Sequence, residues 1–216
     1  MADGLYKPGG DAAEVCRMAG ETRWDSLKPC LERLLGQKRL THSLAVADES
    51  VAMGRIFGGD LPKQALAGLL HDCAKELGDE KLLAIGEAQG LITDEAERGN
   101  PYLLHGPVGA WIARYEWGLD DPDILEAIRL HTTGAPGMGK DACIVFMADL
   151  IEPGRTYEDA PILRQLCRED LRVAMIVAIE QTFAYLGQKG QALHGATARC
   201  YDWLKSERSM GWKAKN

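Results

Sequence analysis

Histidines gather in one part of this sequence and could bind a metal ion. Four of the five lie between positions 42 and 131, and one is followed directly by an aspartate, giving His42, His71-Asp72, His105 and His131. Each has apolar neighbours in the chain, so these imidazoles are expected near a core. A buried imidazole needs a partner, and neutral imidazole is the commonest metal ligand in proteins. The spacing therefore indicates a metal site.

Asp149 is the sixth residue of this set. It interrupts an apolar segment, residues 144–151, where a lone carboxylate is costly unless a cation faces it. Imidazoles and carboxylates without thiolates favour a divalent ion of iron, manganese or cobalt, and are also compatible with catalytic zinc. The predicted ligands are His42, His71, Asp72, His105, His131 and Asp149. One ion or two are both compatible with this set, since His105 and His131 could bind a second ion or contact phosphate instead.

Taken one at a time, these residues have simpler explanations. A lone histidine beside apolar residues is usually a hydrogen-bonded core residue. Asp72 could cap a helix or lie on the surface, and Asp149 could pair with a nearby arginine. The joint occurrence of all six favours the metal site. His194 lies outside the group and is expected to be structural.

Helices are the elements expected to position these residues. Apolar residues recur every three or four positions and strand-like alternation is scarce, so the sequence predicts an all-α fold. The expected helices span residues 26–35, 40–57, 61–78, 80–89, 107–117, 122–131, 141–151, 163–186 and 197–206. Adjacent helical residues project about 100° apart, so His71 and Asp72 could hold one ion from two sides. His42, on the preceding antiparallel helix, would close the site.

Composition limits the classes of function. A chain of 216 residues fits one domain, expected over residues 23–206, with a loose extension at 1–22 and a frayed tail at 207–216. The net charge of −7 opposes binding to nucleic acid. Apolar runs are too short to span a membrane, and no signal peptide is recognisable. Six cysteines without a C-x-x-C pair indicate reduced thiols, so a soluble cytoplasmic protein is expected, and a homodimer is compatible with the sequence.

Five ordered segments of the sequence resemble those of the YqeK-type HD-domain hydrolases. They are RLTHS at residues 39–43, LLHDCAK at 69–75, NPYLLHG at 100–106, HTTGAPGM at 131–138 and ADLIEPGR at 148–155. The resemblance extends from Leu27 to Leu204. It implies an HD-domain helical bundle with a metal site at its centre. It also implies symmetrical cleavage of diadenosine tetraphosphate into two ADP, with iron as the metal.

Cations are expected around the phosphates of such a substrate, because the chain as a whole is acidic. Arg39 lies about one helical turn before His42, and Lys75 about one turn after Asp72, so both could share a face with the metal site. Arg155 is the third candidate. The alternative for each of the three is a solvated surface charge.

Residues around His131 are also predicted to contact substrate. Thr132 and Thr133 follow this histidine, and their hydroxyl and N–H groups could bind phosphate oxygens alongside His105 and His131. The alternative is an ordinary helix C-terminus at Gly134.

Catalysis is expected to involve Asp72, Lys75 and Arg39. A water activated by the metal would attack phosphorus in line with the departing ADP, while the two cations stabilise the developing charge. Two other functions are compatible with the same residues. One is an HD-domain phosphatase acting on mononucleotides, and the other is a nucleotide-binding regulatory module that keeps the metal pocket without turnover.

Overall fold

The computed structural model describes residues 35–206 and 212–214. Within these ranges the chain forms the α-helices α3 to α12 and two short 3-10 helices, with no strand beyond an isolated bridge between Asp170 and Lys213. The all-α prediction is confirmed. The extension predicted at residues 1–22 and nearly all of the helix predicted at 26–35 lie outside the described residues.

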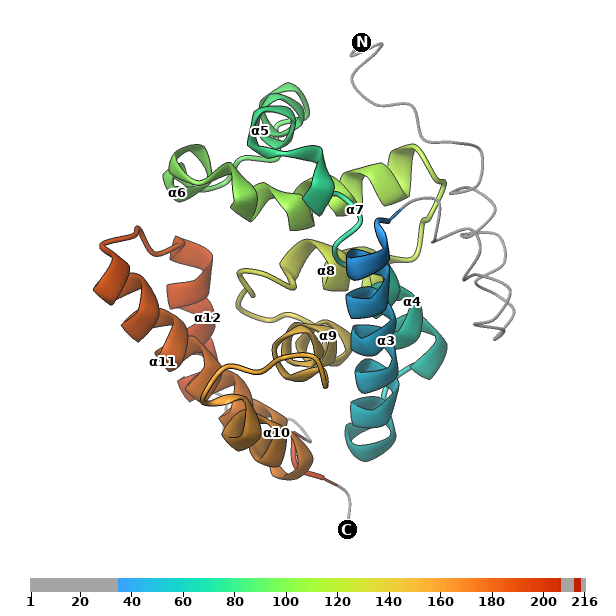
Figure 1. Ribbon diagram of the computed structural model, residues 1–216, viewed down its shortest axis with the longest axis vertical. Coiled ribbons are helices and arrows are strands. Elements are labelled where there is room, and N and C mark those ends of the chain that lie inside the picture. The colour runs from blue at the N-terminus through green and yellow to red at the C-terminus, as the bar shows by residue number, and fades with distance from the viewer. Residues whose placement is uncertain (1–34, 207–211, 215–216) are drawn as a thin grey trace.

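Four helices form the centre of the bundle. α3 (Gln37–Phe57) packs against α4 (Leu61–Leu70) and α9 (Lys140–Ile151), and α8 (Pro122–Leu130) packs against α4 and α9. Figure 1 shows α9 in the middle of the molecule. Apolar side chains cover most of the circumference of α9, and nearly all of them are buried, as expected for a helix surrounded by others.

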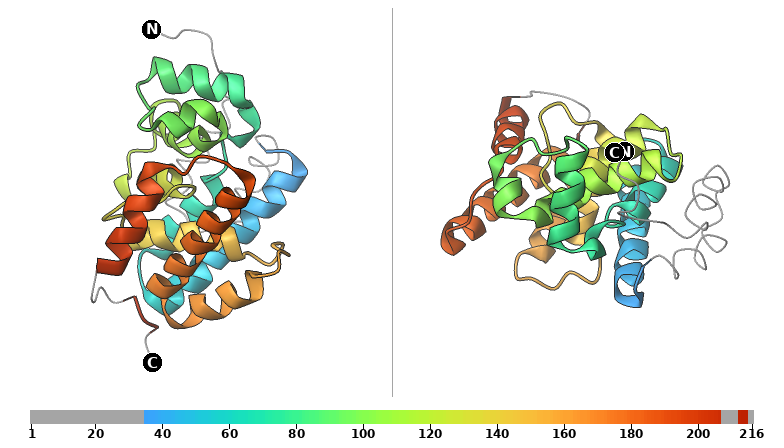
Figure 2. Two further views of the ribbon diagram at one scale, coloured as in Figure 1. Left: turned by 90° about the vertical axis from the view of Figure 1, so that its left-hand side faces the viewer. Right: turned by 90° about the horizontal axis from the view of Figure 1, so that it is seen from above.

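The remaining helices lie on two sides of this centre (Figures 1 and 2). One group contains α5 (Asp79–Ala88), α6 (Glu95–Gly99), the 3-10 helix η2 (Pro101–Leu104) and α7 (His105–Tyr115). The other contains α10 (Ala160–Glu169), α11 (Leu171–Lys189) and α12 (Gly195–Ser206). None of the helices described here is both long and apolar enough to cross a lipid bilayer.

The helix predicted at 61–78 is shorter than expected. α4 ends at Leu70, and a turn leads into the 3-10 helix η1 (Lys75–Leu77). The side chain of His71 donates from Nδ1 to the carbonyl of Gly68 (2.6 Å), the acceptor that a continuing α-helix would use. The next backbone bonds join residues three apart, Cys73 to Leu70 and Lys75 to Asp72. The chain therefore tightens where it carries the HD pair.

The helix predicted at 163–186 is in fact two helices. Asp170 adopts an extended conformation (φ −149°, ψ 105°) between α10 and α11, and its side chain accepts a hydrogen bond from the N–H of Val173 (3.1 Å) as the N-cap of α11. Part of the predicted tail packs at this break, because Trp212 is buried and its carbonyl accepts from the N–H of Leu171 (3.0 Å). Helices α6 and η2 were not predicted.

Candidate metal centre

The fold brings all six predicted ligands together at the centre of the bundle. They lie on α3 (His42), in the turn after α4 (His71 and Asp72), at the start of α7 (His105), directly after α8 (His131) and near the end of α9 (Asp149). Their donor atoms form three overlapping triads, each within 4.8 Å. The side chains of His71 and Asp72 have no exposed surface. The expected bundle with a buried cluster suited to a metal is confirmed, and the role of each ligand stays a prediction.

Asp72 lies between two pairs of imidazoles. Its Oδ2 is 3.4 Å from Nε2 of His71 and 3.7 Å from Nε2 of His42. Its Oδ1 is 3.3 Å from Nε2 of His105 and 3.5 Å from Nε2 of His131. A carboxylate in this position can contribute one oxygen to each pair, so the arrangement suits one ion or two.

Every imidazole of the cluster has its Nδ1 atom occupied by an acceptor. In three rings the acceptor is a backbone carbonyl: Nδ1 of His71 lies 2.6 Å from that of Gly68, Nδ1 of His105 2.5 Å from that of Tyr102, and Nδ1 of His131 2.7 Å from that of Ile128. Nδ1 of His42 lies 3.2 Å from Oε1 of Glu152. Because these oxygens only accept, the proton of each neutral ring belongs on Nδ1. The Nε2 lone pairs then face the cluster, as they do in metal-binding histidines.

The described residues offer fewer hydrogen-bond donors to these Nε2 atoms than there are lone pairs to satisfy. Nε2 of His105 and Nε2 of His131 lie only 2.8 Å apart, and the hydroxyl of Thr132, about equally near both, can donate to only one of them at a time. Nε2 of His42, Nε2 of His71 and Oδ1 of Asp72 are buried without a hydrogen bond in the described ranges. An unsatisfied buried polar atom costs about 1–3 kcal/mol. A divalent cation would satisfy this group, so the residues fit a metal ion.

Most side chains of the cluster are in the protonation state that binds a metal, which is an ionised carboxylate or a neutral imidazole. Burial opposes ionisation of Asp72 and Asp149, but the neighbouring histidines hold the pKa of both carboxyls well below its usual range. Burial lowers the pKa of His131 to about 4, so this ring is neutral at pH 7. For His71, burial lowers the pKa, but the charges of Asp72 and Asp149 and the hydrogen bonds to Asp72 and Gly68 together outweigh it and raise the pKa, so that a proton and a metal ion compete for its Nε2.

The three predicted phosphate-binding cations lie at the edge of this cluster. Arg39 and Lys75 both contact Oδ2 of Asp72, at 2.7 and 3.0 Å, and Arg155 contacts Oδ1 of Asp149 at 2.5 Å. Asp149 therefore has the arginine partner considered as its simpler explanation, in addition to its neighbours in the cluster. The arginine side chains are 27% and 35% exposed, so a ligand at the surface can reach them. Thr132 is half-buried, and Thr133 is buried.

Two residues beside the cluster were missed in the sequence. Tyr102 is 43% exposed, and the centre of its ring lies 4.8 Å from that of His105 and 5.2 Å from Nζ of Lys75. Glu152 is buried against His42. Its one sequence signal is its place three residues after Asp149 and just before a proline.

Comparison with known proteins identifies the family. The model of the HD domain matches residues 39–177. The chain belongs to the HD-domain family. It is 34% identical to the symmetrical bis(5′-nucleosyl)-tetraphosphatase of Bacillus subtilis, over 82% of this chain and 95% of that protein. It is also 34% identical to the enzyme of the same name from Staphylococcus aureus, over 83% of this chain and 93% of that protein.

A solved structure agrees with this assignment. The crystal structure of a predicted HD superfamily hydrolase involved in NAD metabolism, from Clostridium acetobutylicum, superposes with a TM-score of 0.80. The two sequences are 38% identical, and the match covers 85% of this chain and 97% of the other. Together with the buried cluster, these matches make the chain an HD-domain metal-dependent phosphohydrolase homologous to the symmetrical tetraphosphatases.

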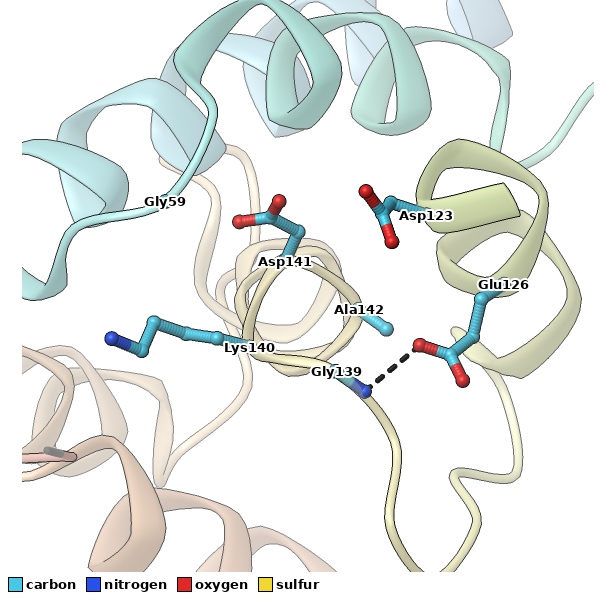
Figure 3. A pocket seen from close by; sticks show the side chains of 7 residues that line it. All are labelled: Gly59, Asp123, Glu126, Gly139, Lys140, Asp141 and Ala142. Atoms are coloured by element: carbon cyan, nitrogen blue, oxygen red, sulfur yellow. Dashed lines mark hydrogen bonds between the residues drawn. The ribbon is translucent and has the colours of Figure 1, made fainter. Parts of the chain in front are cut away.

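Acidic side chains of this HD domain also gather at a second place, a pocket of about 230 Å³ beside the start of α9 (Figure 3). There Glu126 accepts from the N–H of Gly139 (2.8 Å), Asp141 accepts from Gln64 (2.6 Å) and Asp123 pairs with Lys63 (2.6 Å). Each of these carboxylates is satisfied by the protein itself. The pocket therefore differs from the cluster, whose acceptors face one another.

His194 lies outside the cluster, beside α6. Its Nε2 is 3.2 Å from Oε1 of the buried Glu97, and its Nδ1 accepts from the N–H of Ala196 (3.1 Å). We expect His194→Ala to lower the free energy of unfolding by about 1–3 kcal/mol, because a buried carboxylate loses a partner. Metal content should not change. Urea unfolding and elemental analysis of the variant check both points, and lost metal at unchanged stability would contradict the structural role.

Proposed function

We propose that this chain cleaves diadenosine tetraphosphate symmetrically into two ADP at the buried cluster, with iron as the metal. The observation that carries the proposal is the cluster itself, six side chains from five parts of the chain whose lone pairs converge, with three cations at its edge. Two relatives whose alignments cover more than four fifths of this chain are named for the same reaction, which supports the choice of substrate.

His42, His71, Asp72, His105, His131 and Asp149 would hold the metal. A divalent ion in such a site supplies Lewis acidity and brings the pKa of a bound water to about 7. Asp72 would contribute one oxygen beside each pair of imidazoles, Oδ2 with His42 and His71 and Oδ1 with His105 and His131. Arg39 and Lys75 both contact its Oδ2, which places them at the edge of the cluster, where they would bind the phosphates and stabilise charge on the departing ADP. The hydroxyl of Thr132 lies 3.1 Å from Nε2 of His105 and 3.0 Å from Nε2 of His131, so it would donate to a phosphate oxygen bound beside these rings.

Product analysis tests the reaction. Incubation of the metal-loaded protein with diadenosine tetraphosphate should give ADP alone, because attack of water at one central phosphorus with ADP as the leaving group breaks the middle anhydride bond. In water labelled with ¹⁸O, half of the ADP should carry the label. A mixture of ATP and AMP would contradict symmetrical cleavage. Release of inorganic phosphate from mononucleotides would favour the mononucleotide phosphatase, and binding without turnover would favour the regulatory module.

Arg39→Ala and Arg155→Ala should each raise KM about tenfold or more, because a charged hydrogen bond to phosphate contributes about 1.5–3 kcal/mol. Metal content should stay normal, since neither arginine is a predicted ligand. Steady-state kinetics and elemental analysis check both expectations. The matched control is Arg114→Ala, whose side chain is half-exposed and lies over the ring of Tyr115 on α7. Loss of metal in either test variant would show that the arginine had been misassigned.

A further inference from the structure

His42 differs from the other imidazoles of the cluster in what its Nδ1 atom contacts. In His71, His105 and His131 this atom faces a backbone carbonyl. In His42 it faces the carboxylate of Glu152, at 3.2 Å from Oε1. Nε2 on the opposite side of the same ring lies 2.9 Å from Oδ1 of Asp149. His42 therefore connects Glu152 to the cluster.

The backbone holds Glu152 firmly in this place. α9 ends at Ile151, and Glu152 is extended (φ −50°, ψ 153°) because the following residue is Pro153. The guanidinium group of Arg164 donates to the carbonyls of Ile151, Glu152 and Arg155, at 2.8, 2.9 and 2.6 Å. The side chain itself is buried, with the residue only 5% exposed. This carboxylate has little freedom to turn away from His42.

Two N–H donors meet the two oxygens of Glu152. Oε1 faces Nδ1 of His42, and Oε2 accepts from the backbone N–H of Gly154. An ionised carboxylate accepts at both oxygens, whereas an amide of the same shape accepts at one and donates at the other. Only glutamate satisfies both donors with this geometry.

We propose that Glu152 is a positioning residue that keeps the proton of His42 on Nδ1 and so leaves its Nε2 free to bind the metal. The inference rests on the metal centre of the proposed function. If glutamine replaced Glu152, its amide group would have to face either Gly154 or His42. Facing His42, it would donate to Nδ1 and shift the ring proton to Nε2, where it blocks the ligand lone pair.

The test is the affinity of the full chain for Co²⁺, measured by competition with a chromophoric chelator. Glu152→Gln should bind Co²⁺ about 10–100-fold more weakly than the wild type, the range typical for loss of such a partner. Long-range ¹⁵N NMR of the histidine rings should also show His42 leaving the Nδ1–H tautomer. Glu97→Gln is the matched control, because Glu97 is also a buried carboxylate beside a histidine, His194. It should bind Co²⁺ like the wild type.

The outcomes separate this inference from the proposed function. If the wild type binds Co²⁺ and Glu152→Gln binds it within twofold, the inference is wrong and the metal centre stands. If the wild type binds no Co²⁺, both fail. Should Glu152→Gln not fold, Glu152→Asp takes its place, since it keeps the charge but is too short to reach His42. Weakened binding in Glu152→Asp supports positioning, and wild-type binding would overturn it.

Discussion

Asp72→Ala is expected to lower kcat/KM by about 10³-fold or more, equivalent to about 4 kcal/mol of transition-state stabilisation. The reason is its position, since its two oxygens lie near all four imidazoles of the cluster and also contact Arg39 and Lys75. The variant should lose its metal together with its activity. It should keep its helical content, because the backbone bonds of the turn around residue 72 do not use the carboxylate.

Steady-state kinetics, elemental analysis and circular dichroism check these expectations on one preparation. Asp141→Ala is the matched control, because Asp141 is an acidic residue at the start of α9 (Figure 3) that lies outside the cluster and accepts a hydrogen bond from Gln64. The control should keep its metal and its kcat/KM within about twofold, as expected for a site remote from the chemistry. Turnover of Asp72→Ala near the wild-type rate without metal would contradict a metal-dependent mechanism.

Removal of the metal from the wild type has the second large expected effect. Chelation should abolish hydrolysis, and Fe²⁺, Mn²⁺ or Co²⁺ should restore it. It should also destabilise the fold, because the facing lone pairs of His105 and His131 lose their shared cation. An ion present at 100 times its dissociation constant stabilises the native state by about 2.7 kcal/mol. At about 2–4 °C per kcal/mol for a chain of this size, the melting temperature should fall by about 5–10 °C.

Calorimetry with and without a chelator measures this shift. The matched control is Asp72→Ala, whose melting temperature should not respond to the chelator because its site is already empty. An unchanged melting temperature and undiminished activity in the chelated wild type would contradict the presence of a structural and catalytic ion in the cluster.

The sequence was sufficient to predict the helical class and the residues that meet at the centre. Those residues carry a chemical signature, imidazoles and carboxylates beside apolar neighbours, that is independent of where each helix ends. The same pattern could not predict the end of α4, where the side chain of His71 donates a hydrogen bond to the carbonyl of Gly68. Periodicity describes which face of a helix is apolar and contains no information on such a bond.

Glu152 could not be predicted for a different reason. It contacts a histidine that lies 110 residues earlier in the chain, and its place after Asp149 and before a proline does not indicate that partner. The break between α10 and α11 at Asp170 could have been predicted from the sequence, since aspartate is a preferred N-cap and its side chain does cap α11. The prediction of one continuous helix there followed the apolar pattern on both sides of Asp170 and disregarded this single capping residue.

The most direct test of this account is the metal content of the full chain after anaerobic purification, with His71→Ala purified in parallel. Elemental analysis should find at least one divalent transition-metal ion per wild-type chain, with iron predominant, and none retained in His71→Ala. A folded wild-type protein without stoichiometric metal, or a His71→Ala variant with the same metal content as the wild type, would contradict the claim that these six side chains form a metal centre.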